Sequence, residues 1–261
     1  MPSVERAALI THGKPELVEP AVERLRGLAE RLGVELLEGE READIAVVLG
    51  GDGTMLRALA RFLGTGVPVI GVNYGRVGFL TAITPDGLER DLERVFAGGY
   101  RVIELPTLEV TPNGTPHVAV NDVVITSGTI GRIIELGYAI DDEQLGPQRC
   151  DGLVCSTPQG STAYNLSNGG PVLVWGLDAM VLTFVAPHSL HVRPLVVPRG
   201  PTLGVTNRSS DVPTQVIVDG HAVANLGPGD HAQVRIGEKK SLLATLPEVT
   251  FFRRYGATFG H

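Results

Sequence analysis

The sequence contains few of the residue types that mark several common protein classes. Its 261 residues include two cysteines, and only 5% are aromatic. Two cysteines do not make a disulfide framework, and no further pair is present that would complete a zinc site. We therefore expect reduced thiols, a cytoplasmic location and a core filled mainly by aliphatic side chains.

Long apolar runs and extended basic stretches are also missing. No run of about 20 apolar residues is present, and the first ten residues are charged and lack the apolar core of a secretory signal. The formal net charge is −7, and the basic clusters at 239–240 and 253–254 are short. We therefore expect neither a membrane nor a nucleic acid as a partner.

Two widespread nucleotide-binding motifs are absent as well. The chain has no G-x-x-x-x-G-K-[ST] sequence, which excludes a P-loop nucleotidase. No G-x-G-x-x-G sequence follows an apolar strand pattern, which disfavours an ordinary dinucleotide-binding dehydrogenase. A nucleotide site in this chain must therefore use a different loop.

The hydrophobic pattern divides the chain into two regions. Over residues 1–100, short apolar strands alternate with amphipathic helices, which favours a parallel α/β sheet. Over residues 101–244, short strands and turn signals favour a β-rich domain, with one strand expected at 117–126 and one helix near Ser161, which Ser161 or Thr162 would cap. The tail, 245–261, is expected to pack against the first region.

A glycine-rich segment with one carboxylate follows the buried strand predicted at 45–49. In Gly50-Gly51-Asp52-Gly53-Thr54, the glycines permit close approach to an anion, and successive N–H groups can bind phosphate. Ligands bind at such strand ends in open α/β sheets. Asp52 would repel phosphate unless it holds a metal or accepts a proton, and both roles belong to phosphoryl transfer. The alternative is an Asp-Gly turn without a ligand.

A second polar segment runs from Asp151 to Ser167. Its Thr-Pro-Gln-Gly turn leads into the predicted helix start, where hydroxyl and N–H groups suit an anion or a ribose. Tyr164 can stack on a base. The alternative is an ordinary capped helix with a buried tyrosine.

A third polar segment, Asn121-Asp122, interrupts an apolar stretch. The amide suits an adenine edge and the carboxylate suits a ribose diol, because a buried carboxylate is costly without a partner. The alternative is a turn at a strand end. Arg57, Arg132 and Arg149 are weaker candidates for phosphate contacts, with solvated surface charge as the alternative.

Together these segments resemble the NAD kinase family. The matching residues, in the family's order, are Gly50–Thr54, Asn73–Leu80, Asn121-Asp122, Asp151–Pro171, Arg193–Val196 and Asp219-Gly220. Lipid kinases and phosphofructokinases share the glycine-aspartate segment, whereas the Ser-Thr-Pro-x-Gly-Ser-Thr-Ala-Tyr run is far more specific.

The resemblance implies a Rossmann-like α/β domain followed by a β-sandwich-like domain, with NAD bound between them. The reaction would transfer the γ-phosphoryl group of ATP, or of another donor, to the 2′-hydroxyl of the adenosine ribose of NAD, giving NADP. Asp52 would be the catalytic base, and Mg²⁺ would bind the donor phosphates without an assigned protein ligand. Asp151 in such enzymes can come from a neighbouring subunit, so a homodimer or homotetramer is expected.

The resemblance also implies a set of binding residues. Phosphate contacts are expected from Gly50, Gly51, Gly53 and Thr54. NAD contacts are expected from Asp52, Gly53, Arg57, Phe79, Asn121, Asp122, Arg132, Arg149, Asp151, Gln159, Thr162, Ala163, Tyr164, Asn165, Leu166, Ser167, Ala186 and His221. Among these, Asn121 and 162–164 would surround the adenosine, while Asp122, Asp151 and Ser167 would hold the ribose nearer the nicotinamide.

Three positions depart from the family's pattern. Asp122 stands where many relatives have Glu, Gln159 where Thr or Ser is usual, and His221 where Gln is common. Two other functions remain open from the residues alone. One is a kinase with a lipid or sugar acceptor, although no membrane anchor is evident. The other is a dinucleotide-sensing module, although binding alone gains nothing from a carboxylate beside phosphate.

Overall fold

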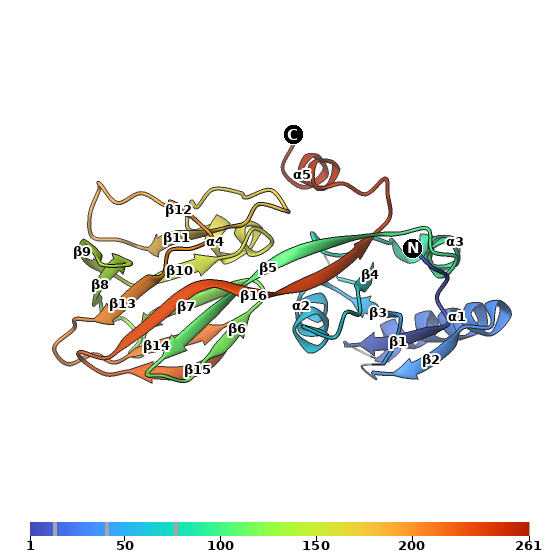
Figure 1. Cartoon of the computed structure of the whole chain (residues 1–261), viewed down its shortest axis with the longest axis horizontal. Coiled ribbons are helices and arrows are strands. Elements are labelled where there is room, and N and C mark those ends of the chain that lie inside the picture. Colours follow the sequence, from blue (N-terminus) through green and yellow to red (C-terminus); the bar gives the residue numbers. More distant parts are fainter. Residues whose placement is uncertain (13–14, 40–41, 76–77, 261) are drawn as a thin grey trace. The chain divides into compact units, whose positions relative to one another are not determined.

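The computed structural model describes residues 1–12, 15–39, 42–75 and 78–260, and it divides into two compact units (Figure 1). Unit 1 contains residues 1–105 and 240–261, and unit 2 contains residues 106–239. Two long strands, β5 (Arg101–Pro112) and β16 (His231–Thr245), each contribute residues to both units.

Unit 1 is the α/β unit, as predicted from its alternating pattern. Its strands are β1 (Arg6–Thr11), β2 (Glu35–Glu38), β3 (Ile45–Gly50) and β4 (Val69–Asn73). Its helices are α1 (Pro15–Leu32), α2 (Asp52–Arg61), the 3-10 helix η1 (Pro85–Gly87), α3 (Leu88–Phe96) and α5 (Phe251–Phe259). The parallel strands lie in the order β2-β1-β3-β4, followed by β16. The order reverses at β1 and β3, where open α/β sheets bind ligands beyond the strands' carboxyl ends.

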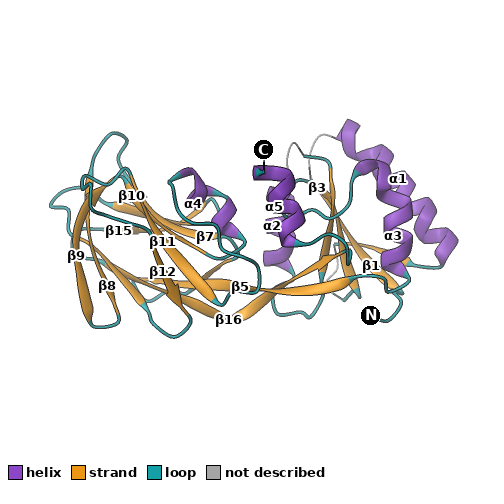
Figure 2. Ribbon diagram, turned by 90° about the horizontal axis from the view of Figure 1, so that it is seen from above, coloured by secondary structure: helices purple, strands orange, loops and turns teal. Residues whose placement is uncertain are grey.

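Helices cover both faces of the sheet in unit 1. α1 and α3 lie on one face and α2 on the other (Figure 2). Ile45, Val47 and Leu49 belong to the core cluster that α1 and α3 share. On the opposite face, Met55 packs against Gly71, where an added Cβ would lie 2.5 Å from the methionine sulfur. Because both faces are covered, all six residues of β3 are buried, which explains its continuous apolar sequence.

Unit 2 is a β-sandwich, again as predicted. Its own strands are β6 (His117–Ala119), β7 (Asp122–Ser127), β8 (Ile134–Ile140), β9 (Glu143–Cys150), β10 (Gly152–Ser156), β11 (Ala179–Val185), β12 (Leu195–Pro198), β13 (Leu203–Asn207), β14 (Thr214–Val218) and β15 (His221–Leu226). One antiparallel sheet has the order β12-β11-β10-β7-β14-β15, and the second contains β16-β13-β8-β9 with β5 and β6. One apolar cluster takes side chains from both sheets and forms the core.

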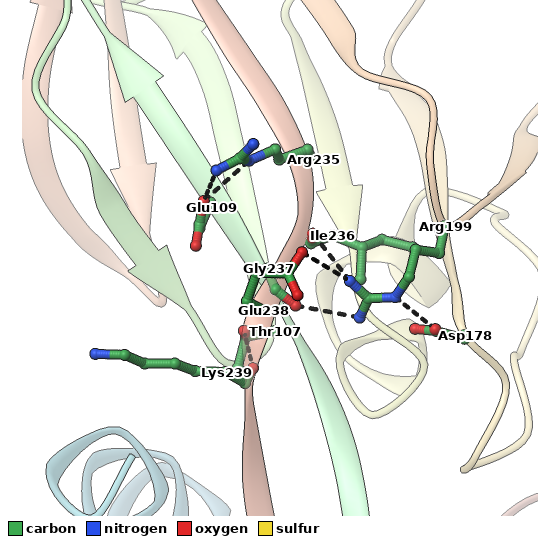
Figure 3. Close-up of polar contacts among 9 residues, drawn as sticks. All are labelled: Thr107, Glu109, Asp178, Arg199, Arg235, Ile236, Gly237, Glu238 and Lys239. Atoms are coloured by element: carbon green, nitrogen blue, oxygen red, sulfur yellow. Dashed lines mark hydrogen bonds and ion pairs between the residues drawn. The ribbon is translucent and has the colours of Figure 1, made fainter. Parts of the chain in front are cut away.

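Side chains anchor β16 within unit 2. The guanidinium of Arg199 donates to the Asp178 carboxylate at 2.5 Å and to the Gly237 carbonyl at 3.1 Å (Figure 3). The Thr107 hydroxyl donates to the Lys239 carbonyl at 2.6 Å. A Cβ on Gly237 would lie 2.7 Å from that hydroxyl, so β5 and β16 approach closely here because residue 237 is glycine.

The structure corrects two local predictions. The single strand predicted at 117–126 is divided into β6 and β7, with the break at 120–121. The helix predicted near Ser161 is a 3-10 turn, η2 (Gly160–Thr162), followed by the four-residue α4 (Tyr164–Ser167).

The hydroxyls of that segment do not cap a helix. Ser161 donates to the Pro158 carbonyl and Thr162 to the Gln159 carbonyl, so both hydroxyls close turns instead. Helix α5 is a further difference, since the sequence indicated only a tail there. No described helix has the length and apolar character needed to cross a membrane.

Two leucines of α1 test the core of unit 1. Leu25 is fully buried and Leu32 is 41% exposed, so Leu→Ala removes the same atoms from two environments on one helix. Leu25→Ala should lower the free energy of unfolding by about 2–5 kcal/mol, because it leaves a cavity. Leu32→Ala should cost about 1 kcal/mol or less. Urea unfolding followed by circular dichroism measures both; equal losses would contradict the assigned packing.

Candidate functional site

Asp52 is the first residue of α2 and directly follows the loop after β3. Its Oδ2 accepts the Phe79 N–H at 2.7 Å, and its Oδ1 accepts the Leu80 N–H at 3.0 Å. The segment that supplies these donors is tied to β4, since the N–H groups of Ala82 and Ile83 donate to the Gly71 carbonyl. The carboxylate is therefore fixed between two neighbouring strand ends of the sheet.

The environment of Asp52 raises its pKa. Burial is the largest cause, because it disfavours the charged form. The N–H groups of Phe79 and Leu80 and the positive charge of Arg254 oppose this effect without cancelling it. Asp52 is therefore a stronger base than an exposed aspartate.

The glycines beside Asp52 are required by close packing. A Cβ on Gly50 would lie 2.6 Å from the Thr54 hydroxyl, and a Cβ on Gly75 would lie 3.0 Å from the Gly51 Cα. The backbones that follow β3 and β4 therefore touch. Gly53 differs, because it is exposed and a Cβ there would meet nothing within 4 Å.

Two other predicted residues belong to the same unit. Phe79 is buried and supplies an N–H to Asp52, and Arg57 is exposed on α2. Arg76 and Val77, within the segment matched at 73–80, lie outside the described residues.

A second aspartate organises the polar segment of unit 2. Asp219 and Gly220 form the two-residue turn between β14 and β15, with φ of 47° and 82°. Such a turn needs positive φ at both positions, which Asp-Gly tolerates. The Asp219 carboxylate accepts the N–H groups of Val120 and Asn121 at 2.7 Å and of Asp122 at 3.2 Å. It thereby replaces the strand pairing that is interrupted at 120–121.

Asp122 is buried beside Asp219. Its residual exposure is 8%, and no salt bridge to it occurs among the described residues. Burial, with a smaller contribution from the negative charge of Asp219, raises the pKa of Asp122 to about 7. The group is therefore poised to gain or lose a proton near neutral pH.

Two amide oxygens of residues at or bonded to the break at 120–121 are buried without a hydrogen-bond donor in the described part of the chain. They are Oδ1 of Asn121 and Oε1 of Gln159. The nitrogen of Gln159 is satisfied, since it donates to the Pro106 carbonyl at 2.7 Å and the Val120 carbonyl at 2.5 Å. An unpaired buried acceptor costs stability, so these oxygens mark a place for a donor that the chain does not supply.

The η2–α4 segment presents a mixture of exposed and buried groups. Ala163, Tyr164 and Ser167 are exposed, the tyrosine by 43%, while Thr162 and Leu166 are half-buried. The Tyr164 ring is thus not the buried tyrosine of the alternative interpretation.

Asn165 is fully buried and satisfied by the protein. Its Nδ2 donates to the Ser161 and Pro171 carbonyls, and its Oδ1 accepts the Thr183 hydroxyl at 2.7 Å. Its side chain therefore holds the loop in place.

The remaining predicted residues of unit 2 lie on its surface. Asp151 is exposed between β9 and β10, and His221 is exposed with Nδ1 3.1 Å from the Asp219 carbonyl. Ala186, after β11, has a φ of 43°, which is strained for a residue with a Cβ.

Arg132 and Arg149 line one surface cavity of about 570 Å³ together with Arg208. Arg132 forms an ion pair with Asp211 at 3.0 Å. Glu135 and Asp211 also line the cavity, so two carboxylates offset most of the charge of its three arginines.

Both regions of the chain match known protein families. The model of the ATP-NAD kinase N-terminal domain matches residues 16–100, and that of the C-terminal domain matches residues 120–246. An NAD kinase of Heliobacterium modesticaldum is 41% identical over 235 residues, covering 88% of this chain and 83% of that protein. The chain belongs to the NAD kinase family. An NAD kinase of Tolumonas auensis is also 41% identical, over 77% of this chain and 71% of that protein.

Solved structures share the fold. The crystal structure of yeast NADH kinase complexed with NADH superimposes with a TM-score of 0.86 at 24% identity, covering 99% of this chain and 88% of that one. An NAD kinase from Archaeoglobus fulgidus in complex with ATP gives a TM-score of 0.79 at 26% identity, covering 98% and 97%. The chain is an enzyme of the phosphotransferase class, with NAD as acceptor and ATP as donor.

Residues important for the geometry of this NAD kinase family member were missed from sequence. Arg254 is 7% exposed and donates to the carbonyls of Phe79 and Thr81, whereas in the sequence the Arg253-Arg254 pair stands out only as a short basic cluster. The amphipathic pattern of 251–259 was the available signal. Asp219 was noted only as part of a matching motif, and its Asp-Gly turn chemistry was the signal for its conformation.

The pH dependence of stability tests the environment of Asp122. An aspartate whose pKa is raised by folding holds a proton that the unfolded chain releases, so its burial costs stability as pH rises from about 4 to about 7. Asp122→Asn removes this cost and should raise the free energy of unfolding more at about pH 8 than at about pH 4. Urea unfolding at both pH values measures it. Asp142→Asn, at an exposed position, is the control; equal effects of Asp122→Asn at both pH values would contradict the assignment.

Proposed function

We propose that Asp52 is the general base that takes the proton from the 2′-hydroxyl of the adenosine ribose of NAD as the γ-phosphoryl group of ATP is transferred to it. The supporting observation is a fixed, partly buried carboxylate whose pKa is raised. A ribose hydroxyl is a weak acid, and a base is most effective when its pKa approaches the working pH. Positioning and electrostatics carry most of the remaining rate in phosphoryl transfer.

The loop after β3 is proposed to contact phosphate groups through its backbone. Gly50 ends β3, and Gly51, Gly53 and Thr54 lie at the start of the ten-residue helix α2, where N–H groups and the helix dipole favour an anion. The open space over Gly53 supports this role, because packing does not require glycine at that position. Its missing side chain leaves the backbone accessible to a ligand.

The adenosine of NAD is proposed to bind beside β7 and α4. The buried side-chain oxygen of Asn121 lacks a donor, and the amino group of adenine would supply one. A ring nitrogen of adenine would accept from the side-chain NH2 group of Asn121. The Gln159 oxygen is a second acceptor. The exposed Tyr164 ring is available to stack, with Thr162 and Ala163 beside it.

The ribose nearer the nicotinamide is proposed to bind Asp122, Asp151 and Ser167. A hydroxyl donated to Asp122 would relieve the cost of its buried charge and favour the ionised form. This is the specific chemical reason to place a sugar diol there. The other residues proposed near NAD are Arg57, Phe79, Arg132, Arg149, Asn165, Leu166, Ala186 and His221.

Magnesium is proposed to arrive with ATP. The described residues contain no group of three His, Cys, Asp or Glu side chains able to hold a metal. Asp52 offers one carboxylate, and Mg²⁺ commonly keeps several waters and takes substrate phosphates as ligands, so these residues fit a nucleotide-borne ion. When bound, Mg²⁺ offsets the charge of the donor phosphates.

A homodimer or homotetramer in the cytoplasm is also proposed. Unit 2 exposes Ile130 at 103% and Leu190 at 89% of full exposure, two apolar side chains that a neighbouring subunit would cover. Cys150 and Cys155 are both buried free thiols, which supports a reducing compartment.

Replacing the base tests the mechanism. Asp52→Asn keeps the shape of the side chain but removes its basicity, so kcat should fall by about 10²–10⁴-fold while NAD still binds. NADP formation from NAD, ATP and Mg²⁺ gives kcat, and calorimetry gives NAD affinity. Asp86→Asn, at an exposed position of the same unit, should retain kcat. Wild-type turnover in Asp52→Asn would remove Asp52 from the mechanism.

Mixing two inactive variants tests whether Asp151 acts across subunits. We expect Asp52→Asn and Asp151→Ala chains to be weakly active alone. If Asp151 serves a neighbour's site, a mixed dimer has one intact site, and activity should reappear after joint refolding. A mixture that stays as inactive as its components would show that Asp151 serves its own chain.

A further inference from the structure

The segment that holds Asp52 is itself held from its other side. Its N–H groups at Phe79 and Leu80 donate to the Asp52 carboxylate. Nη1 of Arg254 donates to the Phe79 carbonyl at 2.6 Å and also to the Thr81 carbonyl. The backbone N–H groups of this segment thus bind the Asp52 carboxylate, and its backbone carbonyls bind the Arg254 guanidinium.

Helix α5 also packs on this segment through aromatic rings. The Phe79 ring lies 5.5 Å from the Phe251 ring in an edge-to-face arrangement and 6.1 Å from the Phe259 ring. Phe251 and Arg254 are the buried residues of α5. Both buried residues of the helix therefore contact the 79–81 segment.

The burial of Arg254 carries a desolvation cost. A guanidinium withdrawn from water loses hydration, and burial lowers the pKa of Arg254 to about 10, an effect that the negative charge of Asp52 opposes. Arg101 of β5 also acts on Arg254, and its charge is repulsive. A buried cation near a second cation is stabilised here by two carbonyls and an anion.

We propose that Arg254 is a positioning residue for Asp52, which fixes the N–H groups of Phe79 and Leu80 and supplies a compensating positive charge. This inference rests on the proposed role of Asp52 as the base. Through Arg254, helix α5 would support catalysis indirectly, because Arg254 acts only through the 79–81 segment. Removal of Arg254 frees that segment and raises the pKa of Asp52, because the positive charge lowers it.

Kinetics of paired variants test the proposal. Arg254→Gln removes the charge but keeps an amide donor, and Arg254→Lys keeps the charge but loses the fork of donors. Arg253→Gln is the matched control, since Arg253 is exposed on the same helix. For each variant, kcat, the KM of NAD, the KM of ATP, the melting temperature and the pH profile of kcat are measured.

We expect Arg254→Gln to lose about 10- to 100-fold in kcat with little change in either KM, because a small misplacement of a base is costly. The acidic limb of its kcat profile should move to higher pH, because the positive charge that lowers the pKa of Asp52 is lost. Arg254→Lys should keep the wild-type limb and lose kcat to a smaller extent. A purely structural role would lower the melting temperature and leave the limb unmoved.

The outcomes separate this proposal from the proposed function. If Arg254→Gln matches Arg253→Gln in kcat and in its pH profile, the proposal is overturned. If Arg254→Gln does not fold, Arg254→Lys decides, and wild-type kcat in that variant overturns the proposal. Wild-type turnover in Asp52→Asn instead overturns the role of Asp52, whatever the Arg254 variants do.

Discussion

The arrangement of this protein depends on aspartates whose carboxylates receive backbone N–H groups from distant segments. Asp52 accepts from residues 27 and 28 positions away, and Asp219 accepts from residues 97 to 99 positions away. In each case a rigid turn or helix start presents the acid, and an irregular segment supplies donors that sheet pairing leaves free. Hydrogen bonds to charged acceptors are stronger than neutral ones, so both irregular segments are held in single conformations.

Burial gives these carboxylates their chemistry. Desolvation is the largest influence on the pKa of Asp52, Asp122 and Asp219, and in all three it acts upward. Asp52 and Asp219 recover part of the cost through backbone donors, whereas Asp122 is left at about 7. A proposed base and a proposed sugar-binding carboxylate therefore differ in how far the protein compensates their charge, which lets one residue type serve two roles.

Close backbone contact explains why the polar segments are rich in small residues. Gly51 and Gly75 bring two loops of unit 1 together, and a Cβ on Gly160 would lie 2.2 Å from the Asn121 carbonyl. Side chains at these positions would separate the segments that carry Asp52 and Asn121 from their supports. Gly53 has no such neighbour, and this contrast is what distinguishes a glycine needed for packing from one suited to a ligand.

Local patterns in the sequence determined the two fold classes, the buried strand before Asp52 and, through the specific motifs, membership of the NAD kinase family. They also placed Asn121 and Asp122 as polar residues in apolar surroundings. Only the tertiary structure decided that residues 79–80 hold Asp52, that Asp219 divides the strand predicted at 117–126, and that α5 buries Arg254. Periodicity and turn chemistry act over a few residues, whereas these bonds join segments that meet only when the chain has closed.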